Sequence, residues 1–187
     1  MALTRKWDDD LTLPTERLVI RAIYPSDAPL IYAAIMETLP HLQEWMPWAS
    51  PAPALADTES FCKHADAQRK AGKDLILIAV DKTTGAHVLS TGIHPKDTGV
   101  PSFEIGYWCR ASKQGQGYVT EVVKALTDYA FTHLGARRVQ IHCDADNAKS
   151  AAVPRRCGFI EEGRMKHHAL KPDTGDLRDT LIFARCQ

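Results

Sequence analysis

The chain has 187 residues, a length that suits one domain with a sizeable core, and we expect a single domain over residues 1–187. Its 23 basic and 23 acidic residues cancel, which argues against a nucleic-acid or membrane-surface binder. No apolar run approaches the roughly 18 residues of a membrane span, and residues 1–10 are too short and too charged for a signal peptide. We therefore expect a cytoplasmic protein.

The cysteines and histidines do not indicate a metal site. The five cysteines are odd in number and lack paired metal spacing, so reduced thiols are the simplest interpretation. His142 and Asp144 come closest to a ligand pair, together with the adjacent His167 and His168. No second cluster completes four ligands, and we predict no metal.

The first half of the chain predicts alternating helices and strands. Ser26 or Asp27 can cap the first helix, with Pro29 in its first turn. Four prolines between residues 39 and 56 predict mostly loop. The expected elements are a strand at 18–22, a helix from 26 or 27 to about 36, a helix at 57–71, and strands at 75–80 and 86–94.

The second half continues in the same way. Apolar residues recur at helical spacing from Val119 to Leu134, and Gly135 is a suitable residue to end that helix. The remaining expected elements are a strand at 103–108, a strand at 138–143, a short helix after Asn147, and strands near 159–168 and 178–185.

The most informative segment is Gln-Gly-Gln-Gly-Tyr-Val at residues 114–119, between a predicted strand and a predicted helix. Glycines let a phosphate approach the backbone, and a helix N-terminus offers unpaired N–H groups and a positive dipole end. A nucleotide P-loop would need Gly-Lys-Ser/Thr here, and a dinucleotide fingerprint would need a third glycine and a later acidic residue. Both are missing, so the segment predicts an anion site of another kind.

That segment resembles the coenzyme A loop of the GNAT N-acetyltransferases, Gln/Arg-x-x-Gly-x-Gly/Ala. Further motifs, in the right order, are similar to the Rim-type branch, which acetylates protein N-termini including those of ribosomal proteins. The resemblance runs from about Leu13 to Arg185 and rests on Thr15–Arg21, Trp45–Trp48, Glu104–Trp108, Cys143–Ser150, Cys157–Phe159 and Glu162–Gly163. It implies an α/β (α+β) GNAT fold with a mixed, mostly antiparallel sheet of seven strands. Strands 4 and 5 should splay apart, and about four helices should flank the sheet.

The resemblance also implies acetyl-CoA as co-substrate. Backbone N–H groups of the loop are expected to hold the pyrophosphate, and the free edge of the fourth strand to pair with the pantetheine amides. Asn147 is expected to contact the pantetheine arm, and Ser150 to donate a proton to the departing thiolate. Val119 departs from the usual Gly or Ala. The expected cofactor contacts are Trp108, Cys109, Arg110, Gln114, Gly115, Gln116, Gly117, Tyr118, Val119, Asn147 and Ser150.

Glu104 is the first candidate for the general base. Strand alternation places it beside Trp108 on one face, although an ion-paired structural carboxylate is an equal alternative. Some Rim-type relatives carry a proposed catalytic glutamate past the Glu-Gly pair, where this chain has no carboxylate. His168 or His167 could substitute, because imidazole titrates near neutral pH, or both could be structural. For Ser150, the alternative is an ordinary serine in the first turn of a helix capped by Asn147.

Trp45 and Trp48 are expected to wall the acceptor cleft, because acceptors enter between the first two helices in related enzymes. They could equally be loop anchors packed on the core, or a dimer contact. The loop at residues 171–176 is a candidate for the opposite rim.

We therefore predict an acetyl-CoA-dependent N-acetyltransferase that acts by direct transfer. The first expected acceptor is a protein N-terminal α-amine, and the second is a small amine. A GNAT-fold acyl-CoA-binding module without turnover is the alternative of another class. Neither a nucleic-acid nor a membrane partner is expected, and the protein could be a monomer or a homodimer.

Overall fold

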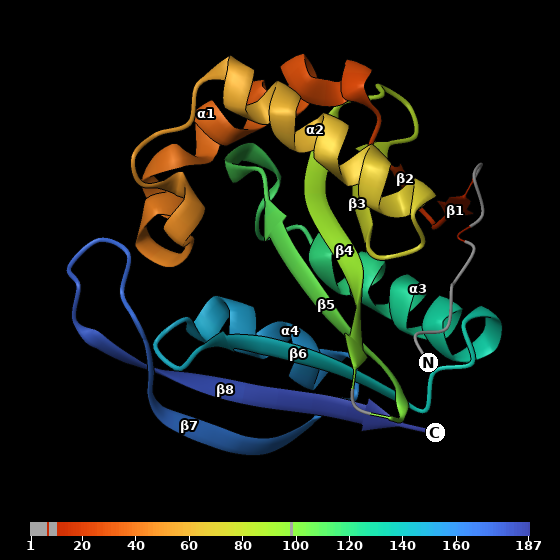
Figure 1. Ribbon diagram of the computed structural model, residues 1–187, viewed down its shortest axis with the longest axis vertical. Helices are drawn as coiled ribbons and strands as arrows, with labels where there is room; N and C mark the ends of the chain where they lie inside the picture. The colour runs from red at the N-terminus through yellow and green to blue at the C-terminus, as the bar shows by residue number, and fades with distance from the viewer. Residues whose placement is uncertain (1–6, 8–10, 98) are drawn as a thin grey trace.

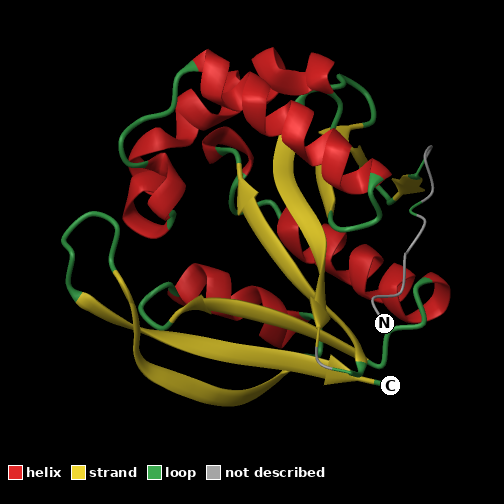
Figure 2. Ribbon diagram, in the orientation of Figure 1, coloured by secondary structure: helices red, strands yellow, loops and turns green. Residues whose placement is uncertain are grey.

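The computed structural model describes residue 7, residues 11–97 and residues 99–187. Within them, four α-helices accompany a sheet of eight strands (Figures 1 and 2). The strands are β1 (Thr12–Pro14), β2 (Leu18–Ala22), β3 (Leu75–Asp81), β4 (His87–Asp97), β5 (Pro101–Cys109), β6 (Arg138–Asp144), β7 (Ile160–Leu170) and β8 (Leu177–Cys186). The helices are α1 (Ala28–Trp45), α2 (Leu55–Lys70), α3 (Tyr118–His133) and α4 (Ala148–Arg156).

The sheet has the order β1-β2-β3-β4-β5-β6-β8-β7, and every neighbouring pair is antiparallel except β5 and β6. This confirms the mixed, mostly antiparallel sheet. The expected count of seven strands was wrong by one, because β1 also pairs with β2. A strand of three residues that ends in Pro14 is too short to show an alternating pattern.

The central strands separate as predicted. β5 and β6 pair only over Ser102–Glu104 and Arg138–Gln140. Beyond Glu104 the two strands diverge, and Figure 1 shows β5 rising away from β6. The divergence leaves the facing backbone edges of both strands unpaired with each other. This opening positions the site described below.

Helices cover both faces of the β2–β5 half of the sheet. Val122, Val123 and Leu126 of α3 pack with Phe103 and Ile105 in one core cluster. A second cluster joins α1, α2 and the other face of β3 through Ile31, Ile35, Leu42, Cys62 and Ile78. β3 is buried from both sides, which explains its continuous apolar sequence. Among the described helices, none is long and apolar enough to cross a membrane.

The first helix is longer than its sequence indicated. Residues 39–45 were expected to be loop, yet α1 runs through Pro40 to Trp45. A proline inside a helix costs about 3 kcal/mol. The burial of Leu42, which is 3% exposed in the second cluster, contributes roughly 1.5–3 kcal/mol and helps to offset that cost. The balance between the cost of Pro40 and the burial of Leu42 depends on tertiary packing and is not apparent in the sequence of the helix alone.

Candidate active site

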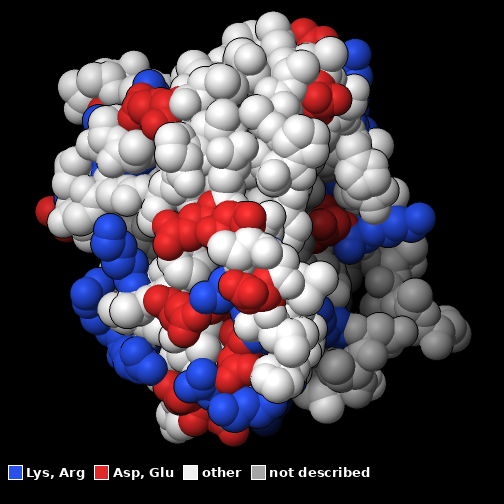
Figure 3. All heavy atoms as spheres, turned by 90° about the vertical axis from the view of Figure 1, so that its left-hand side faces the viewer, with Lys and Arg blue, Asp and Glu red and all other residues white. Residues whose placement is uncertain are grey.

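A cleft of about 720 Å³ opens where β5 and β6 diverge. Its walls come from the end of α1, from α2, from both central strands, from the first turn of α4 and from β7 and β8. Aromatic and apolar side chains line most of it, including Trp45, Met46, Trp48, Phe61 and Trp108. In the side view of Figure 3, Asp and Glu side chains form a patch across the middle of the molecular surface. The surface above this patch is largely uncharged, and the surface below it carries both acidic and basic side chains.

The glycine loop has the geometry of an anion site. Gly115 and Gly117 adopt left-handed backbone conformations, with φ of 73° and 83°, which other residues rarely adopt. Gly117 is the N-cap of α3 and has no side chain to cap the helix. The first-turn N–H groups of α3 therefore lack a side-chain cap, and open space surrounds the Cα of Gly115. This geometry suits an anion such as a phosphate, and residues 109–119 lie outside the residues that line the cleft.

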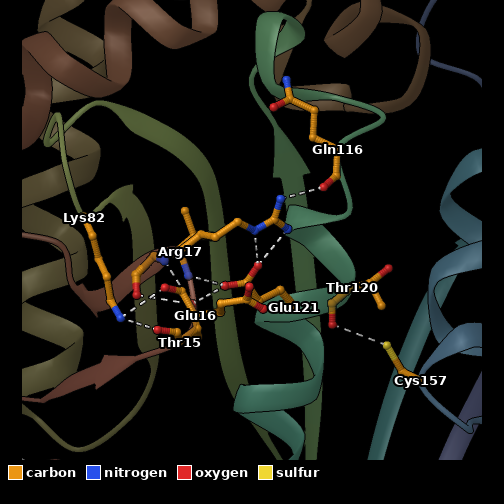
Figure 4. Close-up of polar contacts among 9 residues, drawn as sticks. Thr15, Glu16, Arg17, Lys82, Gln116, Thr120, Glu121 and Cys157 are labelled. Atoms are coloured by element: carbon orange, nitrogen blue, oxygen red, sulfur yellow. Dashed lines mark hydrogen bonds and ion pairs between the residues drawn. The ribbon is translucent and has the colours of Figure 1, made fainter.

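A carboxylate at the start of α3 fastens the loop to the first strands (Figure 4). Glu121 accepts hydrogen bonds from the Thr15 hydroxyl at 2.6 Å and from the backbone and guanidinium of Arg17 at 2.7–2.9 Å. Arg17 also donates to the carbonyl of Gln116 at 2.9 Å and lies 4.1 Å from the Tyr118 ring centre. Burial raises the pKa of Glu121, but these hydrogen bonds outweigh it and lower the pKa.

A second carboxylate holds the segment before the loop. Glu37 of α1 accepts from the Ser112 N–H at 2.9 Å and from Arg110 at 2.6 Å. The hydrogen bonds of Ser112 and then that of Arg110 lower the pKa of Glu37 to about 2. Gln114 donates its side-chain amide to the Cys109 carbonyl at 3.2 Å. Two predicted cofactor contacts, Arg110 and Gln114, thus also hold the backbone of the loop in place.

Ser150 and Asn147 lie together at the first turn of α4 and line the cleft. Asn147 Oδ1 accepts from the Ser150 N–H at 3.0 Å, which is the helix cap weighed as an alternative. The hydroxyl of Ser150 is 3.3 Å from that of Tyr107, which itself donates to the Ser150 carbonyl at 3.1 Å. Burial raises the pKa of Tyr107, so its hydroxyl keeps its proton near neutral pH. The two hydroxyl groups form one hydrogen-bonded pair.

The cysteines beside the cleft are not poised as nucleophiles. Cys143 lines the cleft, and burial raises its pKa to about 11. Cys109, at the end of β5, also has its pKa raised to about 11 by burial. Both thiols are protonated near neutral pH, whereas the thiolate is the nucleophilic form. Direct acetyl transfer without an acyl-cysteine is consistent with this chemistry.

Glu104 lies at the base of the divergence, outside the residues that line the cleft. Its carboxylate is 3.0 Å from Lys96 Nζ, 3.3 Å from Gln140 Nε2 and 3.7 Å from His142 Nδ1. Burial raises its pKa, but the contacts with Lys96 and His142 outweigh burial and lower it. Its predicted role as a base therefore depends on a route through His142, which does line the cleft.

The two adjacent histidines of β7 point to different places. His168 lines the cleft, with Nδ1 3.0 Å from the Thr180 hydroxyl. His167 does not line it; it adopts a left-handed φ of 49° in an irregular part of the β7–β8 pairing, and its N–H donates to Asp179. Such a bulge re-aims a strand residue. The bulge explains why, of these two adjacent histidines, only His168 faces the cleft.

Both predicted acceptor-site tryptophans line the cleft. Trp45 is the last residue of α1, and Trp48 lies in a 3₁₀ turn at Pro47–Ala49. Trp48 is 46% exposed, and its ring centre lies 6.2 Å from that of Trp108. The loop at 171–176 supplies no lining residue, although Ala169 and Arg178 on either side of it do.

Three features of the site were not predicted from the sequence. The anchoring by Arg17 and the hydroxyl pairing of Tyr107 depend on partners 104 and 43 residues away, respectively. The third is His94 of β4, which lines the cleft and lies 2.7 Å from Asp74. The sequence signal for His94 was its spacing of two from Gly92, which places both on one strand face. Among the described residues, no group of three or more His, Cys, Asp or Glu side chains could hold a metal ion.

Residues 17–160 match the model of the acetyltransferase (GNAT) domain family. The chain is 32% identical over 151 residues to the "Putative ribosomal N-acetyltransferase YdaF" of Bacillus subtilis, covering 81% of this chain and 82% of that protein. It is 28% identical over 176 residues to the ribosomal-protein-serine acetyltransferase of Escherichia coli, covering 91% and 93%. The chain therefore belongs to the GNAT acetyltransferase family and is an N-acetyltransferase.

Solved structures share the fold over nearly the whole chain. RimL, the ribosomal L7/L12 α-N-protein acetyltransferase in complex with coenzyme A, superposes with a TM-score of 0.86 at 24% identity, covering 94% of this chain and 98% of RimL. The microcin C7 self-immunity acetyltransferase MccE, in complex with acetyl-CoA and AMP, superposes with a TM-score of 0.83 at 25% identity, covering 92% and 93%. These structures confirm the GNAT fold.

Proposed function

We propose that this enzyme transfers the acetyl group of acetyl-CoA directly to the α-amine of a protein N-terminus. The observation that carries the proposal is a cleft that runs along the unpaired edge of β5 and reaches the Ser150–Tyr107 hydroxyl pair, with the glycine loop and the uncapped N-terminus of α3 a few residues beyond the end of β5. Relatives over most of the chain are named for ribosomal-protein acetylation, which supports the acceptor class.

The cofactor is proposed to extend from the glycine loop along the edge of β5 into this cleft. The N–H groups of residues 114–119 receive the pyrophosphate, and the free edge of β5 at Trp108 and Cys109 pairs with the pantetheine amides. Asn147 contacts the pantetheine arm. The thioester then lies near Ser150, at the start of α4.

The chain's own groups supply the chemistry of transfer. The cleft positions the amine beside the thioester, which alone contributes a large part of the rate by proximity. As the C–S bond breaks, Ser150 donates a proton to the thiolate, with Tyr107 as its hydrogen-bond partner. Such a donor acts mainly in the transition state, when charge develops on sulfur.

The acceptor is proposed to enter between Trp45 and Trp48 on one side and β7 and β8 on the other. A cleft of this volume, open to solvent and lined by aromatic side chains, suits the first residues of a polypeptide. A small amine is the second candidate acceptor. Its support is a shorter match, 33% identity over 52 residues, to the spermidine N(1)-acetyltransferase of Vibrio cholerae.

Two measurements test the proposal. The first detects free thiol released from acetyl-CoA with a panel of short peptides bearing free N-termini and of amine metabolites. Acetylated peptide should appear in mass spectra as a gain of one acetyl group. Release with amine metabolites alone would favour the second acceptor class, and no release with any amine would reject the proposed function.

The second measurement tests the cofactor position. Gly117→Trp should weaken coenzyme A binding at least tenfold, because the side chain blocks the approach of the pyrophosphate to the backbone. The matched control is Gly135→Trp, since Gly135 also has a left-handed φ, of 63°, and open space around it, at the other end of α3. Equal affinity in folded Gly117→Trp and wild-type protein would place the cofactor elsewhere.

A further inference from the structure

His94 lies on the floor of the cleft, across a pair of glycines. Gly92 of β4 and Gly106 of β5 are register partners, and His94 follows Gly92 on the same strand face. A Cβ atom added to Gly92 would lie 2.6 Å from His94 Nε2, and one added to Gly106 would lie 3.6 Å from it. The imidazole therefore occupies the space that side chains at these positions would fill, and it is 37% exposed to the cleft.

A carboxylate fixes the orientation of this imidazole. Asp74, immediately before β3, places Oδ1 2.7 Å from His94 Nδ1. The same oxygen accepts from the N–H of Leu75 at 3.0 Å, which holds the carboxylate in place. An ionised carboxylate only accepts hydrogen bonds, so Nδ1 is the donor in this pair, and Nε2 is the ring nitrogen left to accept a proton.

The other candidate bases differ from His94 in their hydrogen-bond partners or in their position relative to the cleft. Glu104 is held by Lys96 and does not line the cleft, and His168 has a hydroxyl partner rather than a carboxylate. His142 is 3.7 Å from the nearest carboxylate oxygen, and burial lowers its pKa. Of the cleft histidines that the structure describes, only His94 has a carboxylate at hydrogen-bond distance.

We propose that Nε2 of His94 takes the proton of the acceptor ammonium, with Asp74 as the residue that positions the ring. This step rests on the proposed function. The ammonium gives one proton to Nε2, and the freed electron pair of nitrogen forms the N–C bond to the thioester carbonyl. The C–S bond then breaks, its electrons leave with sulfur, and the thiolate takes a proton as the nitrogen loses its second one. The imidazolium returns its proton to solvent.

Several charged groups lie around this ring. Asp74 contacts it from the loop before β3, Glu104 lies opposite it in the β4–β5 register, and Lys96 follows it on β4. The remaining ionisable groups that line the cleft are Asp57, Tyr107, His142, Cys143, Asp144, His168 and Arg178. The test therefore compares pH profiles of variants rather than relying on one titration.

The test measures kcat/KM against pH by thiol release, with the best acceptor of the panel. His94→Gln should lower kcat/KM at neutral pH by about 10²–10⁴-fold and remove the acidic limb that imidazole produces. Its affinity for coenzyme A should stay within about twofold of wild type. His64→Gln is the matched control, because His64 is exposed on α2 and does not line the cleft.

Three further variants distinguish a catalytic base from a histidine with a structural role. Asp74→Asn should lower kcat/KM and shift the acidic limb, whereas Asp74→Glu should recover part of the rate by restoring a carboxylate. Gly92→Ala keeps the imidazole but displaces it, because the added Cβ would overlap Nε2, and it should also lower kcat/KM.

The outcomes are distinguishable. The role of His94 is overturned if the wild-type enzyme turns over and a folded His94→Gln variant has the same rate and the same pH profile. If Glu104→Gln then removed the acidic limb, the base would be Glu104, as the sequence predicted. A wild-type protein that binds coenzyme A but releases no thiol with any amine would reject the proposed function, and the role of His94 with it.

Discussion

At the scale of single residues, the end of the cleft is defined by the hydroxyl pair of Ser150 and Tyr107. Ser150, at the first turn of α4, and Tyr107 of β5 are both partly buried, and Tyr107 packs against the core cluster. Burial raises the pKa of Tyr107, so the tyrosine keeps its proton near neutral pH. In the proposed mechanism Ser150 is the donor to the thiolate, and Tyr107 is its hydrogen-bond partner.

Replacement of this hydroxyl should affect turnover more than binding. Ser150→Ala is expected to lower kcat by about 10–100-fold, at or below the lower end of the 10²–10⁴-fold range for general acid–base assistance, because the Tyr107 hydroxyl remains nearby. The dissociation constant for acetyl-CoA should change by less than about threefold. Steady-state kinetics with calorimetric binding checks this, with Ser60→Ala on the exposed face of α2 as control. An unchanged kcat would show that Ser150 has only a structural role in the first turn of α4, which Asn147 caps.

At the scale of elements, α3 is fastened to β2 by the contacts around its first turn. Glu121 accepts hydrogen bonds from the Thr15 hydroxyl and from the backbone N–H and the guanidinium of Arg17. Lys82 in turn donates to the carbonyl of Thr15 (Figure 4). Because Arg17 also binds the carbonyl of Gln116, the ion pair connects the first strands directly to the glycine loop. The loop geometry thus depends on residues about 100 positions earlier in the chain.

Removal of the charge at this junction should loosen the loop. Glu121→Gln is expected to weaken coenzyme A binding about fivefold, which corresponds to roughly 1 kcal/mol, since Arg17 is 40% exposed and solvent screens the pair. Glu162→Gln is the matched control, because it removes the surface ion pair with Arg138, which does not contact the loop. Equal affinity in the two variants would show that the loop holds its shape without Glu121.

At the scale of the whole molecule, a histidine is enclosed between the sheet and the helices. His87 is 0% exposed, stacks on Trp108 with ring centres 5.2 Å apart, and shares a hydrogen bond with Ser90 at 2.9 Å. Its Nδ1 has no partner among the described residues. Burial lowers the pKa of His87 to about 4, so the folded protein holds this ring neutral.

The buried ring should make stability depend on pH. The unfolded chain binds the proton at about pH 6.5, above the folded pKa of about 4, so the stabilisation is complete above pH 6.5 and is lost as pH falls toward 4. Between pH 7.5 and pH 5.0 the wild type should lose about 2 kcal/mol more unfolding free energy than His87→Phe. Urea unfolding at both pH values measures this difference. An equal loss in the two proteins would show that His87 titrates normally in the fold.

Local sequence patterns determined most of the fold. Alternating apolar residues predicted β2, β5 and β6, and helical spacing predicted α3, because each pattern reflects which face of one element is buried. The glycine loop was predictable for the same local reason: a left-handed backbone before a helix favours glycine. Each of these patterns lies within one segment of the sequence, although the contacts that hold the glycine loop come from Thr15 and Arg17.

Tertiary structure decided the rest. It extended α1 through Pro40, because burial of Leu42 offsets the cost of the proline, and it added β1, which has too few residues for a pattern. It joined Asp74 to His94 and Arg17 to Glu121 across 20 and 104 positions. Such pairs arise from the order of strands in the sheet, and that order is a property of the whole chain rather than of any one segment.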